Sequence, residues 1–130
     1  MNRINTSTGE IKQFHFVTYD NNYPDPYLSA DFPIAVLEAH DGMIWVGGSL
    51  DVAGDAETAA FLATINPDTD EITYIDMPYE IGLNSVRSLT QDPVTGNIAF
   101  SLAQQGFCVY DITSGSVSYT HLTLPTIYSV

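Results

Sequence analysis

The sequence predicts an all-β protein in which one antiparallel meander is repeated in tandem. Short runs of Val, Ile, Phe, Tyr and Thr alternate with turn signals at regular spacing, which is typical of strands joined by tight turns. The clearest meander lies at 86–116, the same pattern occurs earlier at 34–77, and its second half occurs again at 4–16. Repeated small sheets of this kind stack side by side and cover one another's apolar faces.

Residues 1–16 predict the outer half of one repeat unit. A strand ends near Ile4, Thr6–Gly9 supplies a turn, and Glu10–Phe16 alternates as a second strand. The inner half of this unit is missing. Two interpretations remain open: the chain is cut at an arbitrary point, or these strands complete the last blade of a closed ring.

Residues 17–33 are the longest unpatterned segment, and we expect a loop rich in Pro, Asn and Asp between repeat units. Tyr23 and Tyr27, interspersed with acidic residues, make it a candidate contact surface, and an ordinary connection is the alternative. The acidic run does not match an EF-hand loop, because Pro24 and Asp25 stand where an oxygen ligand and a glycine are required.

The two full units, 34–77 and 78–116, share one order of strands and turns. In the first unit the predicted strands are Ile34–Ala39, Met43–Gly48, Ala59–Asn66 and Glu71–Met77, with an acidic loop at Ser49–Thr58. In the second unit they are Val86–Gln91, Asn97–Leu102 and Phe107–Ile112, followed by the approach to a fourth strand. The main difference between the units is the loop that joins the second and third strands, which is how repeat arrays vary.

The last residues, 117–130, are predicted to be a non-native tail. The decapeptide Val117–Thr126, VSYTHLTLPT, resembles the translation of a transposon-end adapter used in sequencing libraries. A strand through Leu122 and Leu124 is the structural alternative. Segment 117–130 is therefore kept out of the functional argument, and a strand formed there would consist of foreign residues.

Together these units predict an open fragment of a β-propeller, with about two to two-and-a-half antiparallel four-stranded blades, because complete propellers need about four to eight. A small fold that imitates the repeat is the alternative. The expected partners of the fragment are the remaining blades of the same propeller, which would cover the apolar faces at the two ends of the array.

The motif DGMIWVGG at 41–48 resembles the D-G-N-L-W-I-G-T core of the two-component-regulator propeller repeat. The unit at 86–115 follows the same family scheme, with Ala99 in place of its Trp and Ser101 in place of its Gly. The structural motif positions are Asp41, Gly42, Trp45, Gly47, Gly96, Gly106 and Gly115. Gly and Asp serve turns at such positions, and Trp45 is expected to pack between blades. The resemblance therefore specifies fold better than function.

That family's propellers form periplasmic sensing regions of bacterial hybrid histidine kinases, often responding to glycans. The resemblance implies a non-catalytic sensor or binding region, periplasmic or extracellular, with a small molecule or glycan as ligand. One alternative is a streptogramin-lyase-like propeller enzyme, which the stretch NPDTDEITY at 66–74 resembles. That lyase needs a catalytic histidine and a carboxylate, and neither His15 nor His40 matches a catalytic motif. The other alternative is a structural repeat of a large secreted protein.

Sixteen acidic residues against three basic ones, Arg3, Lys12 and Arg87, give the chain a formal net charge of −13. Such a surface repels phosphate backbones and anionic lipids, so we expect no nucleic-acid partner and no membrane contact by this segment. Cys108 is the only cysteine, which excludes an intrachain disulfide, and its position in a strand predicts a small buried hydrophobe. We identify no motif for a cofactor or for hydrolytic catalysis.

In a propeller, the loops between blades and those between the second and third strands emerge on one face, where ligands bind. The candidate ligand-binding residues on these loops are Tyr23, Tyr27, Asp51, Asp55, Tyr79 and Gln104. Asp51, Asp55 and Glu57 also offer hard oxygen ligands for calcium, with a solvated acidic loop as the alternative. We assign no metal, no cofactor and no catalytic residue.

Overall fold

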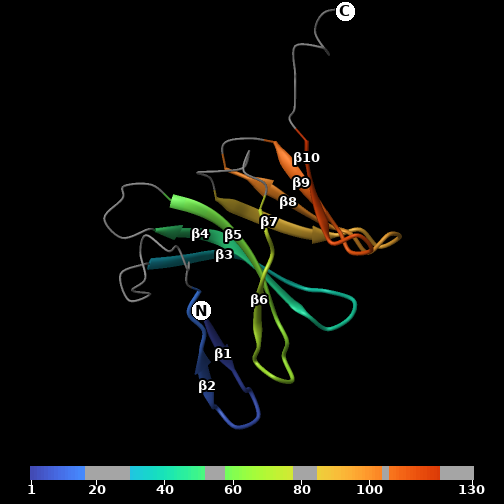
Figure 1. Ribbon diagram of the computed structural model, residues 1–130. Helices are drawn as coiled ribbons and strands as arrows, with labels where there is room; N and C mark the ends of the chain where they lie inside the picture. The colour runs from blue at the N-terminus through green and yellow to red at the C-terminus, as the bar shows by residue number, and fades with distance from the viewer. Residues whose placement is uncertain (17–29, 52–57, 78–84, 104–105, 121–130) are drawn as a thin grey trace, which may run out of the picture.

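The computed structural model describes residues 1–16, 30–51, 58–77, 85–103 and 106–120. These residues contain ten β-strands and no helix, arranged in antiparallel sheets of two, four and four strands (Figure 1). The all-β prediction is confirmed for this part of the chain. Within it there is also no helix of the length and hydrophobicity that a membrane span requires.

The strands are neighbours in space in the order in which they occur in the chain. The hairpin consists of β1 (Asn2–Ile4) and β2 (Ile11–Gln13). The first sheet consists of β3 (Ala30–Glu38), β4 (Ile44–Asp51), β5 (Thr58–Ile65) and β6 (Ile72–Tyr74). The second sheet consists of β7 (Val86–Gln91), β8 (Ile98–Leu102), β9 (Phe107–Asp111) and β10 (Ser116–Thr120). Both four-stranded sheets are therefore meanders, as the sequence predicted.

Each four-stranded sheet carries a β-bulge in its first strand. The pairing of β3 with β4 shifts between Pro33 and Ala35, and the pairing of β7 with β8 shifts between Val86 and Ser88. A bulge bends its strand and increases the local twist, so its position helps to determine the shape of a sheet. The common position of the two bulges supports treating the sheets as structural repeats.

β3 and β4 run further than the sequence predicted, whereas β2 and β6 are shorter than the predicted strands Glu10–Phe16 and Glu71–Met77. β3 begins at Ala30 instead of Ile34, and β4 ends at Asp51 instead of Gly48. The two added segments pair with each other, so residues 30–33 and 49–51, which the sequence assigned to loops, belong to strands. Pro33 is compatible with this strand because β3 lies at the edge of its sheet, where a missing N–H is tolerated.

The fourth strand of the second sheet extends into the predicted non-native tail. β10 pairs antiparallel with β9 from Ser116 to Thr120, and Val117 and Tyr119 pack against the apolar core. Residues 121–130 lie outside the described part of the chain. That 117–130 is a non-native tail stays a prediction from the sequence, because a foreign segment of suitable sequence can pair with β9 as well as a native one.

The first and second sheets pack face to face through one apolar core. Its buried members are Ala39, Trp45, Leu62, Val86, Ile98, Phe100, Leu102 and Cys108. The rings of Trp45 in β4 and Tyr110 in β9 lie 5.1 Å apart, centroid to centroid, with an angle of 57° between their planes. Trp45 therefore packs between the two sheets, as predicted, and an aromatic side chain buries a large apolar area there.

The opposite face of the first sheet packs against the hairpin (Figure 1). Phe14 and Phe16, which follow β2, are buried against residues of β4 and β5. The rings of Phe16 and Phe61 are stacked, with centroids 5.0 Å apart. The first sheet is thus covered on both faces, which explains the continuous apolar run that begins at Met43.

Two adjacent glycines permit close approaches on either side of β4. A methyl group at Gly47 would lie 2.5 Å from Cγ1 of Val86 in the second sheet. A methyl group at Gly48 would lie 2.0 Å from the carbonyl oxygen of Phe32 at the β3 bulge. Gly47 therefore determines how closely the sheets stack, and Gly48 determines how β3 pairs with β4.

Gly47→Ala is predicted to destabilise the protein by about 1–3 kcal/mol, because the added methyl overpacks the sheet interface against Val86. Removing the opposing side chain should relieve the overlap. Val86→Ala is therefore expected to cost less in the Gly47→Ala background than in the wild type, with a coupling energy of about 0.5–3 kcal/mol. Chemical denaturation of the four proteins in this double-mutant cycle measures both values.

Gly48→Ala is the matched control, since its methyl would meet backbone atoms of Phe32 and Pro33 instead of Val86. We expect it to destabilise the protein at least as strongly as Gly47→Ala, with no coupling to Val86. Strict additivity of Gly47→Ala and Val86→Ala would contradict the face-to-face packing of the two sheets.

Candidate functional site

The structure describes only one of the six predicted ligand-binding residues. The five outside the described residues are Tyr23, Tyr27, Asp55, Tyr79 and Gln104, and Glu57 lies there too. Asp51 is the last residue of β4, flanked by Ala30 on β3 and Thr58 on β5. The sequence placed Asp51 in a loop, and its pairing on both sides corrects that assignment. The predicted ligand-binding face as a whole stays a prediction.

The motif residues of the repeat serve turns and packing. Oδ1 of Asp41 accepts a hydrogen bond from the N–H of Met43 at 3.0 Å, which closes the turn between β3 and β4. Positive φ angles of +87°, +77°, +29° and +73° occur at Gly42, Gly96, Gly106 and Gly115. With Trp45 and Gly47 at the sheet interface, the described motif positions have the structural roles that the sequence predicted.

Four described hairpin loops share one hydrogen-bonded form. They span residues 5–10, 66–71, 92–97 and 111–116. In each, the side-chain oxygen of the first residue, Asn or Asp, accepts from the N–H two residues further on at 2.8–2.9 Å. The hydroxyl oxygen of the fourth residue, Thr or Ser, accepts from the N–H of the sixth at 3.2–3.4 Å. The loops therefore satisfy their own backbone groups.

The fifth residue of each of these loops has a positive φ. Three of the loops have glycine at this position, and the 66–71 loop has Asp70. Gly9, Gly96 and Gly115 occupy the position in the other loops, whereas Asp70 has a φ of +62°. It is the one residue other than glycine with a positive φ in the described part of the chain. Such a backbone is strained for a residue with a side chain, although Asp tolerates it better than most. The strain indicates that the Asp70 carboxylate has a role.

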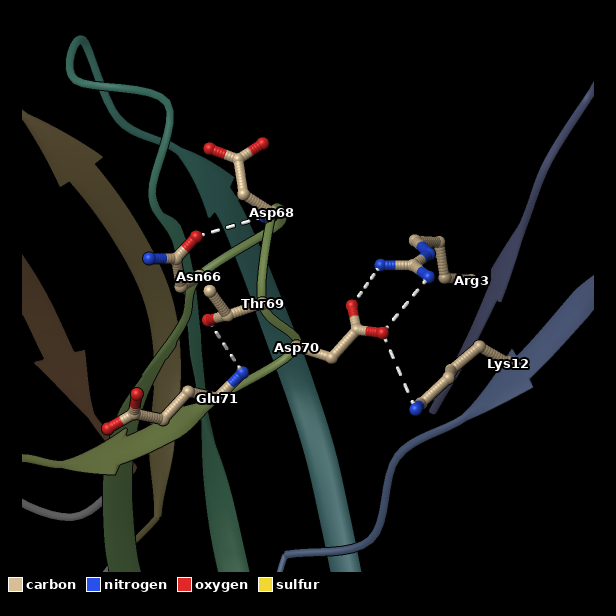
Figure 2. Close-up of polar contacts among 7 residues, drawn as sticks. All are labelled: Arg3, Lys12, Asn66, Asp68, Thr69, Asp70 and Glu71. Atoms are coloured by element: carbon tan, nitrogen blue, oxygen red, sulfur yellow. Dashed lines mark hydrogen bonds and ion pairs between the residues drawn. The ribbon is translucent and has the colours of Figure 1, made fainter.

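The carboxylate of Asp70 binds two cations of the hairpin (Figure 2). Nη1 of Arg3 pairs with Oδ1, while Nη2 of Arg3 and Nζ of Lys12 each lie 3.4 Å from Oδ2. The pKa of Asp70 lies below its ordinary value of 3.8, mainly because its carboxylate accepts a hydrogen bond from Arg3. The interaction with Lys12 lowers this pKa further. This ionic cluster joins the hairpin to the first sheet.

Sequence reasoning missed the ionic cluster because Arg3 and Asp70 lie 67 positions apart and form no local motif. One signal was available in the alignment of the four loops, in which Asp70 stands where the others have glycine. A second was the position of Arg3 and Lys12, two of the three basic residues in the chain, in one short hairpin.

Two hollows adjoin the ionic cluster and share Arg3 and Pro67. The polar one has a volume of about 340 Å³ and is lined by Arg3, Asn5, Glu10, Lys12 and Pro67. The apolar one has a volume of about 270 Å³ and is lined by Met1, Asn2, Arg3, Phe14, Val36, Ile44, Ile65 and Pro67. The apolar hollow lies between the hairpin and the first sheet, so these two units are incompletely packed against each other.

The described residues include one thiol, that of Cys108, and its surroundings make it unreactive. Cys108 is fully buried in the core between the sheets, and burial raises the pKa of its thiol to about 11. The predicted role of Cys108 as a buried hydrophobe is confirmed. The two histidines of the lyase alternative, His15 and His40, are exposed. Within the described ranges, no three residues among His, Cys, Asp and Glu are grouped to hold a metal ion.

Comparison with known proteins found no match for the chain among family models, curated proteins or solved structures. The resemblance to propeller repeats therefore depends on the motif residues at 41–48 and 86–115. The stacking of two equivalent meanders is a separate observation.

Asp70→Asn is predicted to loosen the hairpin from the first sheet. Asparagine tolerates a positive φ but lacks the charge that binds Arg3 and Lys12. Amide hydrogen exchange should become severalfold faster in β1 and β2 and stay unchanged in the second sheet. Asp68→Asn, an exposed position in the same loop, is the control with the same charge change. Equal exchange rates in the two variants would contradict a role for the cluster.

The contribution of Asp70 also depends on pH. Because its pKa in the folded protein lies below 3.8, its carboxylate stabilises the fold above that value and loses the effect as the pH falls through the folded-state pKa. The wild type and Asp70→Asn should therefore differ at neutral pH and converge in strong acid. High salt should reduce the same difference, because the ion pairs are partly exposed.

The thiol of Cys108 is predicted to resist labelling in the native protein. Raising its pKa from 9.0 to about 11 lowers the thiolate fraction at neutral pH by about 100-fold, and burial blocks the reagent in addition. Absorbance measurements with a disulfide reagent should show slow modification in buffer and complete modification in denaturant. Rapid stoichiometric labelling without denaturant would show that the core between the sheets opens readily.

Proposed function

We propose that the chain is a β-propeller segment of a ligand-sensing or ligand-binding region and that it acts as a binding scaffold. The observation that supports this most directly is the stacking of two equivalent four-stranded meanders through Trp45. Tandem sheets that cover each other in this way are the building units of propellers. The role in sensing rests on the resemblance of the motif at 41–48 to two-component-regulator propeller repeats.

We infer the end of the sheets at which a ligand binds from where the strands begin and end. The four hairpin loops and the turn at Asp41 lie at one end of the sheets, and their polar groups are largely hydrogen-bonded within the loops. The start of β3, the end of β4 and the start of β5 lie at the opposite end, as do the start of β7 and the end of β8 (Figure 1). The segments that connect these ends carry the predicted ligand-binding residues. We assign ligand binding to this second end.

The charge of the chain restricts the class of ligand. With a net charge of −13, the chain repels anionic molecules over a distance of about 8–10 Å at physiological salt. Tyrosines with a nearby carboxylate suit sugars, since an aromatic ring packs on a pyranose face and an acidic oxygen accepts from hydroxyls. We therefore propose a neutral glycan as the ligand, and the same charge argues against sulfated or sialylated ones.

A glycan array that contains neutral and acidic oligosaccharides tests this function. We expect binding confined to neutral glycans, weakened about tenfold or more by Tyr27→Ala. The matched control is Tyr74→Ala, which removes a tyrosine from β6 near the hairpin-loop end of the first sheet and should leave binding within about twofold. Mass spectrometry of the glycans after incubation should show them intact. Cleaved or eliminated products would establish an enzyme instead, and an array without any neutral binder would refute the glycan proposal.

A further inference from the structure

The hairpin β1–β2 has the form of the last two strands of a four-stranded sheet. Its loop at 5–10 has the form that all four hairpin loops share, so the ladder beyond the loop identifies the pair. β1 and β2 pair at three positions, and the N–H of Phe14 then donates to the carbonyl of Met1 at 2.7 Å; β5 and β6 likewise pair at three positions, and the N–H of Ile75 then donates to the carbonyl of Leu62 at 2.8 Å. In the two complete sheets, the first strand of that final pair also bonds to a strand on its other side: β5 pairs with β4, and β9 pairs with β8. β1 pairs with β2 alone among the described residues.

The free edge of β1 presents backbone groups that are ready to pair. Met1 and Phe14 exchange two backbone hydrogen bonds of 3.1 Å and 2.7 Å, and the N–H of Asn5 donates to Glu10 at 2.8 Å. Bonded and non-bonded pairs alternate along an antiparallel ladder. The N–H and C=O groups of Asn2 and Ile4 therefore point away from β2, and an unpaired edge of this kind is a template for another strand.

The part of the first sheet that lies beside β1 has exposed apolar residues, whereas the equivalent residues of the second sheet are covered by the first sheet. When the two sheets are aligned by their bulges, Ile44 corresponds to Ile98 and Val36 corresponds to Leu89. Ile98 is fully buried beneath the first sheet, and Leu89 packs against the same core. Ile44 is only partly buried, Val36 is 59% exposed, and both line the apolar hollow of about 270 Å³. The hairpin therefore covers this face of the first sheet less completely than the first sheet covers the second.

We propose that the edge of β1 and the adjoining apolar hollow form a docking site for a two-stranded β-hairpin of the β3–β4 type. Its second strand would pair antiparallel with β1, as β4 pairs with β5, and its inward face would carry an aromatic residue followed two positions later by glycine, as Trp45 and Gly47 do. This is strand addition, in which backbone bonds supply affinity and side-chain fit supplies specificity. The inference rests on the proposed repeat architecture.

The repeat supplies a specific probe for this site. A labelled peptide with the sequence of residues 30–51 contains both strands, the Asp41–Gly42 turn and the Trp45–Gly47 pair. We expect saturable binding to the full chain by fluorescence anisotropy. A peptide with Gly47→Val should bind at least about tenfold more weakly, because the larger side chain cannot approach the apolar hollow as glycine does.

Two exposed valines provide matched variants of the chain. Val36→Asp places a charge in the docking site, whereas Val94→Asp makes the same change in the loop between β7 and β8, where Val94 is 90% exposed. Both positions are exposed, so both variants should fold. Binding of the 30–51 peptide should fall about tenfold or more with Val36→Asp and stay within about twofold of wild type with Val94→Asp. Ile4→Pro, which removes an N–H from the free edge, should weaken binding as well, whereas Ile4→Thr should not.

The possible outcomes separate this inference from its rivals. Absence of saturable binding up to about 1 mM peptide, or an equal loss with Val36→Asp and Val94→Asp, would overturn it. Self-association of the chain that Val36→Asp abolishes, without peptide binding, would assign the site to a second copy and overturn the proposed occupant. A chain that binds neutral glycans but not the peptide would lose this inference and keep the proposed function. If the chain binds the peptide but no glycan, the docking inference stands and the proposed glycan binding is refuted.

Discussion

The face-to-face packing of the two four-stranded sheets is the interaction on which the rest of the structure depends. Side chains alternate along a strand, so Trp45 and Val46 point to opposite faces of the first sheet. Both are buried, at 6% and 0% exposure. A sheet with two apolar faces cannot bury both alone, and it needs a neighbour on each side. The second sheet and the hairpin fill these two positions, which gives the fold the character of a linear stack.

The repeated loops show how a stack is built from small units with little variation. Each loop uses Asn or Asp at its start, a hydroxyl at its fourth position and a positive φ at its fifth, so short sequences suffice to join two strands. The 66–71 loop departs from this form only at its fifth position, where Asp70 replaces glycine. The loop keeps the shared hydrogen bonds and accepts the less favourable backbone, while the carboxylate becomes available to bind Arg3 and Lys12 of the adjacent hairpin.

The sequence predicted best those features that depend on local patterns. The range of β7 agreed with the structure at both ends, and the four hairpin loops lie where Gly, Asp and Asn marked turns. Trp45 was placed correctly because a bulky aromatic residue in a doubly apolar strand must be covered. Features that depend on partners distant in the chain were missed. The early start of β3 requires pairing with the end of β4, and the ionic cluster at Asp70 requires a hairpin that is stacked on the sheet.

At the hairpin-loop end of the sheets, the polar side chains are engaged by the loops themselves. At the hairpin-loop end, carboxylate and hydroxyl oxygens accept hydrogen bonds from the loop backbone, and the bonds from Val94 and Thr95 lower the pKa of Asp92. Groups that are engaged in this way are poorly available to a ligand, since binding would replace bonds already made. Recognition of a partner then requires groups left unpaired by the repeat itself. On the described surface, the free edge of β1 has such groups, and its backbone suits a strand rather than a small molecule.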